Sequence, residues 1–326
     1  MQTLSHAAIV NLPPELSGSL TFHLPMELVA LRDAGASPAV MQIRTNQRMA
    51  EAYATGLVDP PMYRWAVERY SSCGSALLSD NPTDKLGAAR DIEPLAEGLA
   101  GAAFHGLIRL GYGAWQRDAD ELTRGLAYMR TRRQVLSSPD PTRRVAMSHD
   151  ADMPSAEQRA NSTVFDLLNL VAGTGACVPR QSTGITTPSL LARAAAALVQ
   201  RNPSSFVAVH AMTGLHALCE VHALVTGEAP GDDAGEGIMA GWWMAFAVAA
   251  RACNLLVMSE EPEPATVRLE FDTLDALVSA SIKSNETHDV KLAVALRRMV
   301  HFGVMSSQEA IAVGVARLSS SALQAC

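Results

Sequence analysis

The chain has 326 residues, of which 48% are hydrophobic and only 18% are charged, and its formal net charge is −7. This apolar content excludes an intrinsically disordered chain, and the acidic balance argues against a nucleic-acid binder, which normally carries a basic patch. Aromatic residues make up only 5% of the chain, whereas alanine is abundant. Such a composition favours helices over sheets, so we expect an all-α protein.

Apolar residues at helical spacing predict helices along the first half of the chain. We expect a short helix that carries Met26 and Leu31 and ends near Gly35, and another that begins at Pro60. Two further helices are predicted in this half, at Ile92–Gly113 and Asp118–Met129.

The second half of the chain continues the helical pattern. Ala-rich helices are predicted at Leu190–Val199 and Phe206–Val225. The uncharged segment Gly237–Ala250 is too short for the ~20 residues that cross a bilayer, and we interpret it as a buried helix. Residues rich in Pro, Gly, Ser and Asp predict loops at 137–146, 173–187, 227–237 and 260–264. None of these loops resembles a domain linker, so we predict one domain over residues 1–326 with roughly ten to thirteen helices.

Several common signatures are missing from the sequence. There is no dinucleotide fingerprint, P-loop, G-x-S-x-G elbow or H-E-x-x-H pair, so no flavin or nicotinamide site is expected, and a need for NADPH stays open. The five cysteines contain no C-x-x-C pair, and the N-terminal segment does not resemble a signal peptide. We therefore expect a cytoplasmic protein that binds neither nucleic acid nor membrane, and the apolar surplus leaves a homodimer open.

Histidines in apolar surroundings are the most informative residues of the sequence. His23, His105 and His288 lie in such segments, as do both His210 and His216. A buried imidazole without a partner is costly, so each needs a hydrogen bond or a metal. One such residue alone is most often a hydrogen-bonded core histidine, but four such segments in one domain indicate a metal site. Imidazole ligands suit Fe, Zn, Cu or Ni better than Mg or Ca.

A lysine follows the last of these histidines at helical spacing. If Ser284 or Asn285 caps a helix, His288 and Lys291 project from one face of its first turns. The alternative is an exposed amphipathic helix start. However, Lys291 is followed by Leu-Ala-Val-Ala-Leu, and an apolar setting lowers the pKa of a lysine. The neutral amine can react with CO₂ to form a carbamate, which is a carboxylate able to bind a metal.

Four segments together resemble the questin oxidase-like family. They are His23-Leu-Pro-Met-Glu-Leu-Val-Ala-Leu, Phe104-His105-Gly-Leu-Ile-Arg-Leu-Gly-Tyr-Gly, Asn285-Glu-Thr-His288-Asp-Val-Lys291-Leu and, more loosely, His210-Ala-Met-Thr-Gly. They span about residues 20 to 300. The resemblance implies an all-helical, flavin-independent oxygenase that uses non-haem Fe(II) and O₂ on anthraquinone-type aromatic or polyketide natural products. The outcome is oxidative C–C cleavage or Baeyer–Villiger-like oxygen insertion.

The resemblance also implies a ligand set. His23, His105 and His288 match family histidines and Lys291 matches a carboxylated lysine, so the predicted metal ligands are these four and His210, with His216 as the substitute. His288 and Lys291 are also the predicted catalytic residues. The competing interpretations are a metal-dependent hydrolase with zinc in the same site and a helical ligand-binding protein without turnover.

Two further predictions concern the surroundings of the site. Trp242, Trp243 and Phe246 are candidates for an apolar substrate-pocket wall, with core packing as the alternative. Arg109 follows His105 by one helical turn, so it either orients an acidic substrate group or forms a surface salt bridge.

Overall fold

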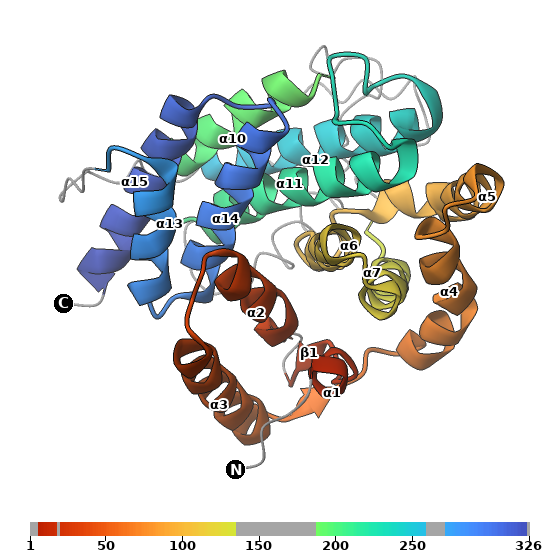
Figure 1. Ribbon diagram of the computed structural model, residues 1–326, viewed down its shortest axis with the longest axis horizontal. Helices are drawn as coiled ribbons and strands as arrows, with labels where there is room; N and C mark the ends of the chain where they lie inside the picture. Colours follow the sequence, from red (N-terminus) through yellow and green to blue (C-terminus); the bar gives the residue numbers. More distant parts are fainter. Residues whose placement is uncertain (1–5, 18–19, 135–186, 259–270, 325–326) are drawn as a thin grey trace, which may run out of the picture.

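The computed structural model describes residues 6–17, 20–134, 187–258 and 271–324, and these form an all-α fold (Figure 1). The described residues contain 13 α-helices, so the predicted fold class is confirmed. In the N-terminal half they are α1 (His6–Val10), α2 (Leu24–Asp33), α3 (Pro38–Thr55), α4 (Tyr63–Leu77), α5 (Pro82–Ile92), α6 (His105–Gln116) and α7 (Ala119–Thr131). The others are α10 (Pro188–Arg201), α11 (Phe206–Thr226), α12 (Ala240–Met258), α13 (Leu274–Lys283), α14 (Thr287–His301) and α15 (Ser307–Gln324).

Helix α11 runs through the middle of the protein. Every residue from Val207 to His222 is buried, and α6, α10, α12 and α14 pack around this helix (Figure 1). Its contact with α6 is very close, because a Cβ atom added at Gly111 would lie 2.4 Å from the Cα of Ala217. A side chain at position 111 would therefore force the two backbones apart.

One cluster of buried apolar side chains extends from Ile9 to Leu318, so both ends of the described chain contribute to a common core. Among the described residues, no helix combines the length and the apolar character that a bilayer crossing requires. The Gly237–Ala250 segment instead forms a short 3₁₀ turn, η3 (Gly237–Met239), and most of α12, as expected for a buried helix.

A small sheet, which the sequence pattern did not predict, includes the residues directly before α2. Strands β1 (Glu15–Leu16), β2 (Leu20–Thr21) and β3 (Leu57–Val58) pair antiparallel in the order β2-β1-β3. Each strand has only two residues, too few for the alternation by which a strand is recognised in a sequence. The sequence pattern also missed five helices: α1, α3, α5, α13 and α15.

The predicted continuous helix Ile92–Gly113 is wrong. Helix α5 ends at Ile92 and is followed by the 3₁₀ helix η1 (Glu93–Gly98), which has a proline in its first turn. Ala102, Ala103 and Phe104 then have φ angles of 49°, 54° and 65°, a left-handed turn of three non-glycine residues directly before α6. Such a conformation costs roughly 1–2 kcal/mol per residue and needs support from its surroundings.

The other predicted helices agree closely with α2, α7, α10 and α11, whereas the helix expected from Pro60 begins at Tyr63. The predicted loops at 137–146 and 260–264, and nearly all of 173–187, lie outside the described residues.

Candidate metal centre

The four selected histidines come together at one point. One nitrogen from each of His23, His105, His210 and His288 lies within 4.8 Å of the others. Three of these residues lie at the N-terminal ends of helices. His23 is the N-cap of α2, His105 is the first residue of α6, and His288 is the second residue of α14. His210 lies on α11. Four segments that are far apart in sequence thus deliver one imidazole each.

Hydrogen bonds fix the orientation of three of the rings. The Nδ1–H of His105 donates to the carbonyl oxygen of Ala102 at 2.5 Å, and that of His210 donates to the carbonyl oxygen of Phe206 at 2.6 Å. His288 Nδ1 lies 2.6 Å from the Oε1 atom of Glu286. Because each partner is an oxygen acceptor, the proton of each neutral ring belongs on Nδ1. The Nε2 atoms therefore carry free lone pairs.

These lone pairs face one another. His105 Nε2 lies 2.8 Å from His23 Nε2 and 3.0 Å from His210 Nε2, while His288 Nε2 is buried and has no hydrogen-bond partner. The His105–His210 contact joins two acceptors and cannot be a hydrogen bond. A cation among the four Nε2 atoms would satisfy all of them, and the oxygen acceptors behind three of the rings would hold those rings in the orientation that binds it. The residues present therefore fit a metal ion.

The electrostatics of the cluster keep the imidazoles neutral. Burial lowers the pKa of His210 to about 3, and it also lowers the pKa values of His23, His105 and His288 well below their usual range. The positive charge of Lys291 lowers all four pKa values further. Neutral imidazole is the form that binds metals.

Lys291 lies close enough to this cluster for its charge to act on all four histidines. It lies on α14 three residues after His288, and only 1% of its surface is exposed. Burial lowers the pKa of Lys291 to about 8, although the carboxylates of Glu27 and Glu286 act in the opposite direction. The prediction that this lysine is buried with a lowered pKa is confirmed, and the exposed-helix alternative is wrong.

Two glutamates that the sequence analysis did not select support the site. Glu286 accepts from the backbone N–H of His288 as well as from its ring, so it is the N-cap of α14 in place of Ser284 or Asn285. Glu27 is fully buried, and its Oε2 atom accepts from Thr287 Oγ1 and Arg48 Nε, both at 2.9 Å.

Both glutamates could have been found from their spacing. Glu286 precedes His288 by two residues, and Glu27 follows His23 by four, which is one helical turn.

A hollow of about 170 Å³ leads to the cluster. It is lined by two of the histidines, the small sheet, α3 and the start of α14: Leu16, Thr21, Phe22, His23, Arg48, Glu51, Asn285, Glu286, Thr287 and His288. We call it the entrance hollow.

Three of the sequence interpretations are corrected. His216 does not join the cluster, since its Nε2 atom contacts Glu220 at 3.2 Å, and Glu220 pairs with Arg298. Arg109 does not lie on the surface: it forms a buried ion pair with Glu121 at 2.6 Å, beside a small gap that His105 also lines.

The third correction concerns the proposed apolar pocket wall. Trp242, Trp243 and Phe246 are fully buried in the core, and Trp243 Nε1 donates to His222 Nδ1 at 3.1 Å. Core packing, the alternative, is therefore the correct interpretation.

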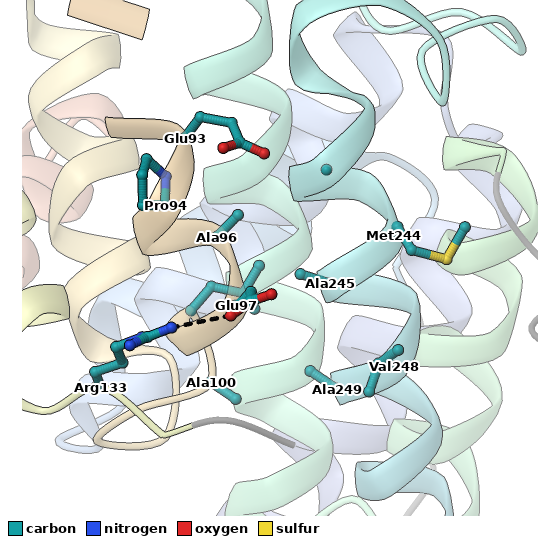
Figure 2. Close-up of a pocket in the computed structure, with 12 residues that line it drawn as sticks. Glu93, Pro94, Ala96, Glu97, Ala100, Arg133, Met244, Ala245, Val248 and Ala249 are labelled. Carbon is teal, nitrogen blue, oxygen red and sulfur yellow. Dashed lines mark hydrogen bonds and ion pairs between the residues drawn. The ribbon is translucent and has the colours of Figure 1, made fainter. Parts of the chain in front are cut away.

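A larger hollow lies away from the histidines, between η1 and α12 (Figure 2). Its volume is about 320 Å³. Beside it, Arg133 Nη2 and Glu97 Oε2 form an ion pair with a separation of 2.9 Å (Figure 2). Alanines and Val248 of α12 form its opposite wall. None of the four histidines lines it, so it adds nothing to the metal centre.

Comparison of the chain with protein-family models, curated proteins and solved structures gave no match in any of the three. The interpretation of the site therefore depends on its own geometry.

Proposed function

We propose that this protein is a metal-dependent oxygenase with Fe(II) in the four-histidine site. The observation that carries the proposal is the convergence of four histidine Nε2 atoms, with three of the four rings held from behind by oxygen acceptors. Neutral nitrogen ligands suit iron, and iron bound there would supply the activation of O₂. The resemblance to questin oxidase-like proteins directs the reaction toward oxidative C–C cleavage or Baeyer–Villiger-like insertion on an aromatic or polyketide-type substrate.

Lys291 is proposed to act as a carbamate. Its neutral amine adds to CO₂, the new N–C bond forms, and one proton is released to solvent, so the side chain becomes an anion. Burial favours the neutral amine that this reaction needs. A negative ligand beside four neutral imidazoles would stabilise the higher oxidation state of iron. His288 would hold the metal from the same face of α14.

The test is metal content and oxygen chemistry of the purified full-length protein. Elemental analysis after anaerobic reconstitution with Fe(II) and bicarbonate is expected to give one iron per chain. O₂ consumption with a polyhydroxylated aromatic substrate is expected to depend on that iron. Stoichiometric zinc with hydrolytic activity would favour the hydrolase, and no bound metal after reconstitution would refute the proposal.

The lysine is tested separately with ¹³C-labelled bicarbonate. The wild-type protein should show one carbamate carbon signal by NMR, and Lys291→Arg should lose it. Lys283→Arg, on the neighbouring helix α13, is the matched control and should keep it. The spectra are recorded on the diamagnetic Zn(II) form, and wild-type protein with bound zinc and no carbamate signal would refute the role of Lys291 alone.

A further inference from the structure

The entrance hollow gives access to the histidine cluster and limits the size of what can reach it. It reaches His23 and His288, and the His288 Nε2 atom is buried without a hydrogen-bond partner. Whatever enters the hollow therefore approaches the proposed metal directly. An apolar cavity of roughly 150 Å³ accommodates one benzene molecule, and the volume of the hollow is about 170 Å³. That room suits a single ring, with the rest of a larger molecule outside.

Arg48, the positively charged side chain that lines the hollow, is already paired with acceptors of the protein. Arg48 donates from Nε to Glu27 at 2.9 Å, from Nη1 to both oxygens of Glu51 at 3.1 Å, and from Nη2 to the carbonyl oxygen of Asn285 at 2.9 Å. All three guanidinium nitrogens are thus engaged. A carboxylate that entered the hollow would have to displace one of these partners before it could pair with the arginine.

The remaining charged groups of the hollow are acceptors. The side chains of Glu51 and Glu286 are 58% and 37% exposed, so part of each carboxylate faces solvent at the hollow. With Arg48, the lining carries a formal charge of −1. Carboxylates accept hydrogen bonds from hydroxyl groups and repel other anions.

We propose that the entrance hollow admits one hydroxyl-bearing ring to the metal and disfavours carboxylates, and that Glu51 is the residue that sets this specificity. Glu51 acts in two ways: it accepts a hydrogen bond from the entering hydroxyl, and it occupies Nη1 of Arg48. The inference rests on the proposed function for the presence of the metal. The preference for a hydroxyl over a carboxylate depends only on the residues that line the hollow.

The experiment compares phenol, a single ring with a neutral hydroxyl group, with benzoate, a single ring with a negatively charged carboxylate. Their affinities are measured by ligand-observed NMR on the full-length protein loaded with Co(II), with the diamagnetic Zn(II) form as reference. Paramagnetic broadening of the probe protons locates each probe at the metal. The same titrations are repeated on metal-free protein.

The decisive variant is Glu51→Gln. It removes one anion and replaces the charge-assisted contacts of Arg48 Nη1 with at most one neutral hydrogen bond, which an entering carboxylate can displace more readily. The ratio of benzoate affinity to phenol affinity should therefore rise roughly tenfold or more, about the effect of one charge-assisted hydrogen bond. Glu68→Gln, an exposed glutamate on α4, is the matched control and should leave the ratio unchanged.

An unchanged ratio in Glu51→Gln would overturn the proposal, as would probes that bind without broadening by Co(II). Failure of every metal to bind is a different result: it refutes the proposed function, while the ratio in metal-free protein still decides the role of Glu51.

Discussion

The facing Nε2 atoms of the four histidines lead to one prediction about stability. Without a metal, the His105–His210 contact joins two acceptors and His288 Nε2 has no partner, so buried polar atoms stay unsatisfied. Each costs about 1–3 kcal/mol. Metal binding should therefore stabilise the protein strongly, and removal of His105, whose Nε2 contacts two of the other rings, should abolish most of this gain.

The magnitude follows from linkage. A metal at 1,000 times its dissociation constant stabilises the folded state by about 4.1 kcal/mol. At about 2 °C per kcal/mol for a large domain, the melting temperature should rise by roughly 8 °C. Loss of an outer-shell hydrogen bond already costs 10–100-fold in metal affinity, and loss of a ligand should cost at least the upper value. His105→Ala should then retain a shift of about 3 °C or less at the same metal concentration.

The assay is anaerobic thermal unfolding of chelator-treated protein with and without Fe(II), Co(II) or Zn(II). His301→Ala is the control, because His301 is an exposed histidine at the end of α14 and should keep the full shift. The reasoning is refuted if His105→Ala shows the same shift as wild type, or if no metal raises the melting temperature of wild type.

Three other substitutions probe the support of the site. Glu286→Ala removes both the cap of α14 and the acceptor behind His288, so metal affinity should fall 10–100-fold and stability by about 1 kcal/mol, as read by metal titration and denaturant unfolding. Gly111→Ala should destabilise by about 1–3 kcal/mol, whereas Gly87→Ala, where a Cβ would meet nothing within 4 Å, should not destabilise. Glu220→Gln should cost about 1–3 kcal/mol, because it replaces the charge-assisted hydrogen bonds from Arg298 with weaker neutral ones.

The Glu220 substitution also has a pH signature. Its hydrogen bonds to His216 and Arg298 lower the pKa of Glu220 below that of an unfolded glutamate, despite its burial. This stabilisation is fully present above the unfolded pKa of about 4.3 and is lost as the pH falls through the lower folded value. The variant should lose this acid dependence, and equal slopes of stability against pH below about 4.5 would contradict the assignment.

The control for Glu286→Ala is Glu309→Ala, an acidic residue in the first turn of α15, away from the histidines. It should reduce stability slightly and leave metal affinity unchanged. Equal losses of affinity in both variants would show that Glu286 acts only through general stability.

The sequence determined the fold class and the residue types of the candidate site. Helical periodicity fixed α2, α7, α10 and α11 within a few residues, since that pattern is local. The cost of a buried imidazole singled out the histidines, and the three-residue spacing placed His288 and Lys291 on one helix face. Composition had already excluded disorder and sheet-rich folds.

The tertiary structure decided what no local pattern contains. His210 and His216 lie six residues apart, so they face directions about 120° apart around α11, and only the packing of neighbouring helices decides which one meets the other histidines. The left-handed turn before His105 opposes the local preference of alanine, so it must be imposed by its surroundings. The sequence alone indicated imidazole ligands, because the type of each side chain is a local property. Only the packing determined which histidines form the site, because their convergence depends on segments that are far apart in the sequence.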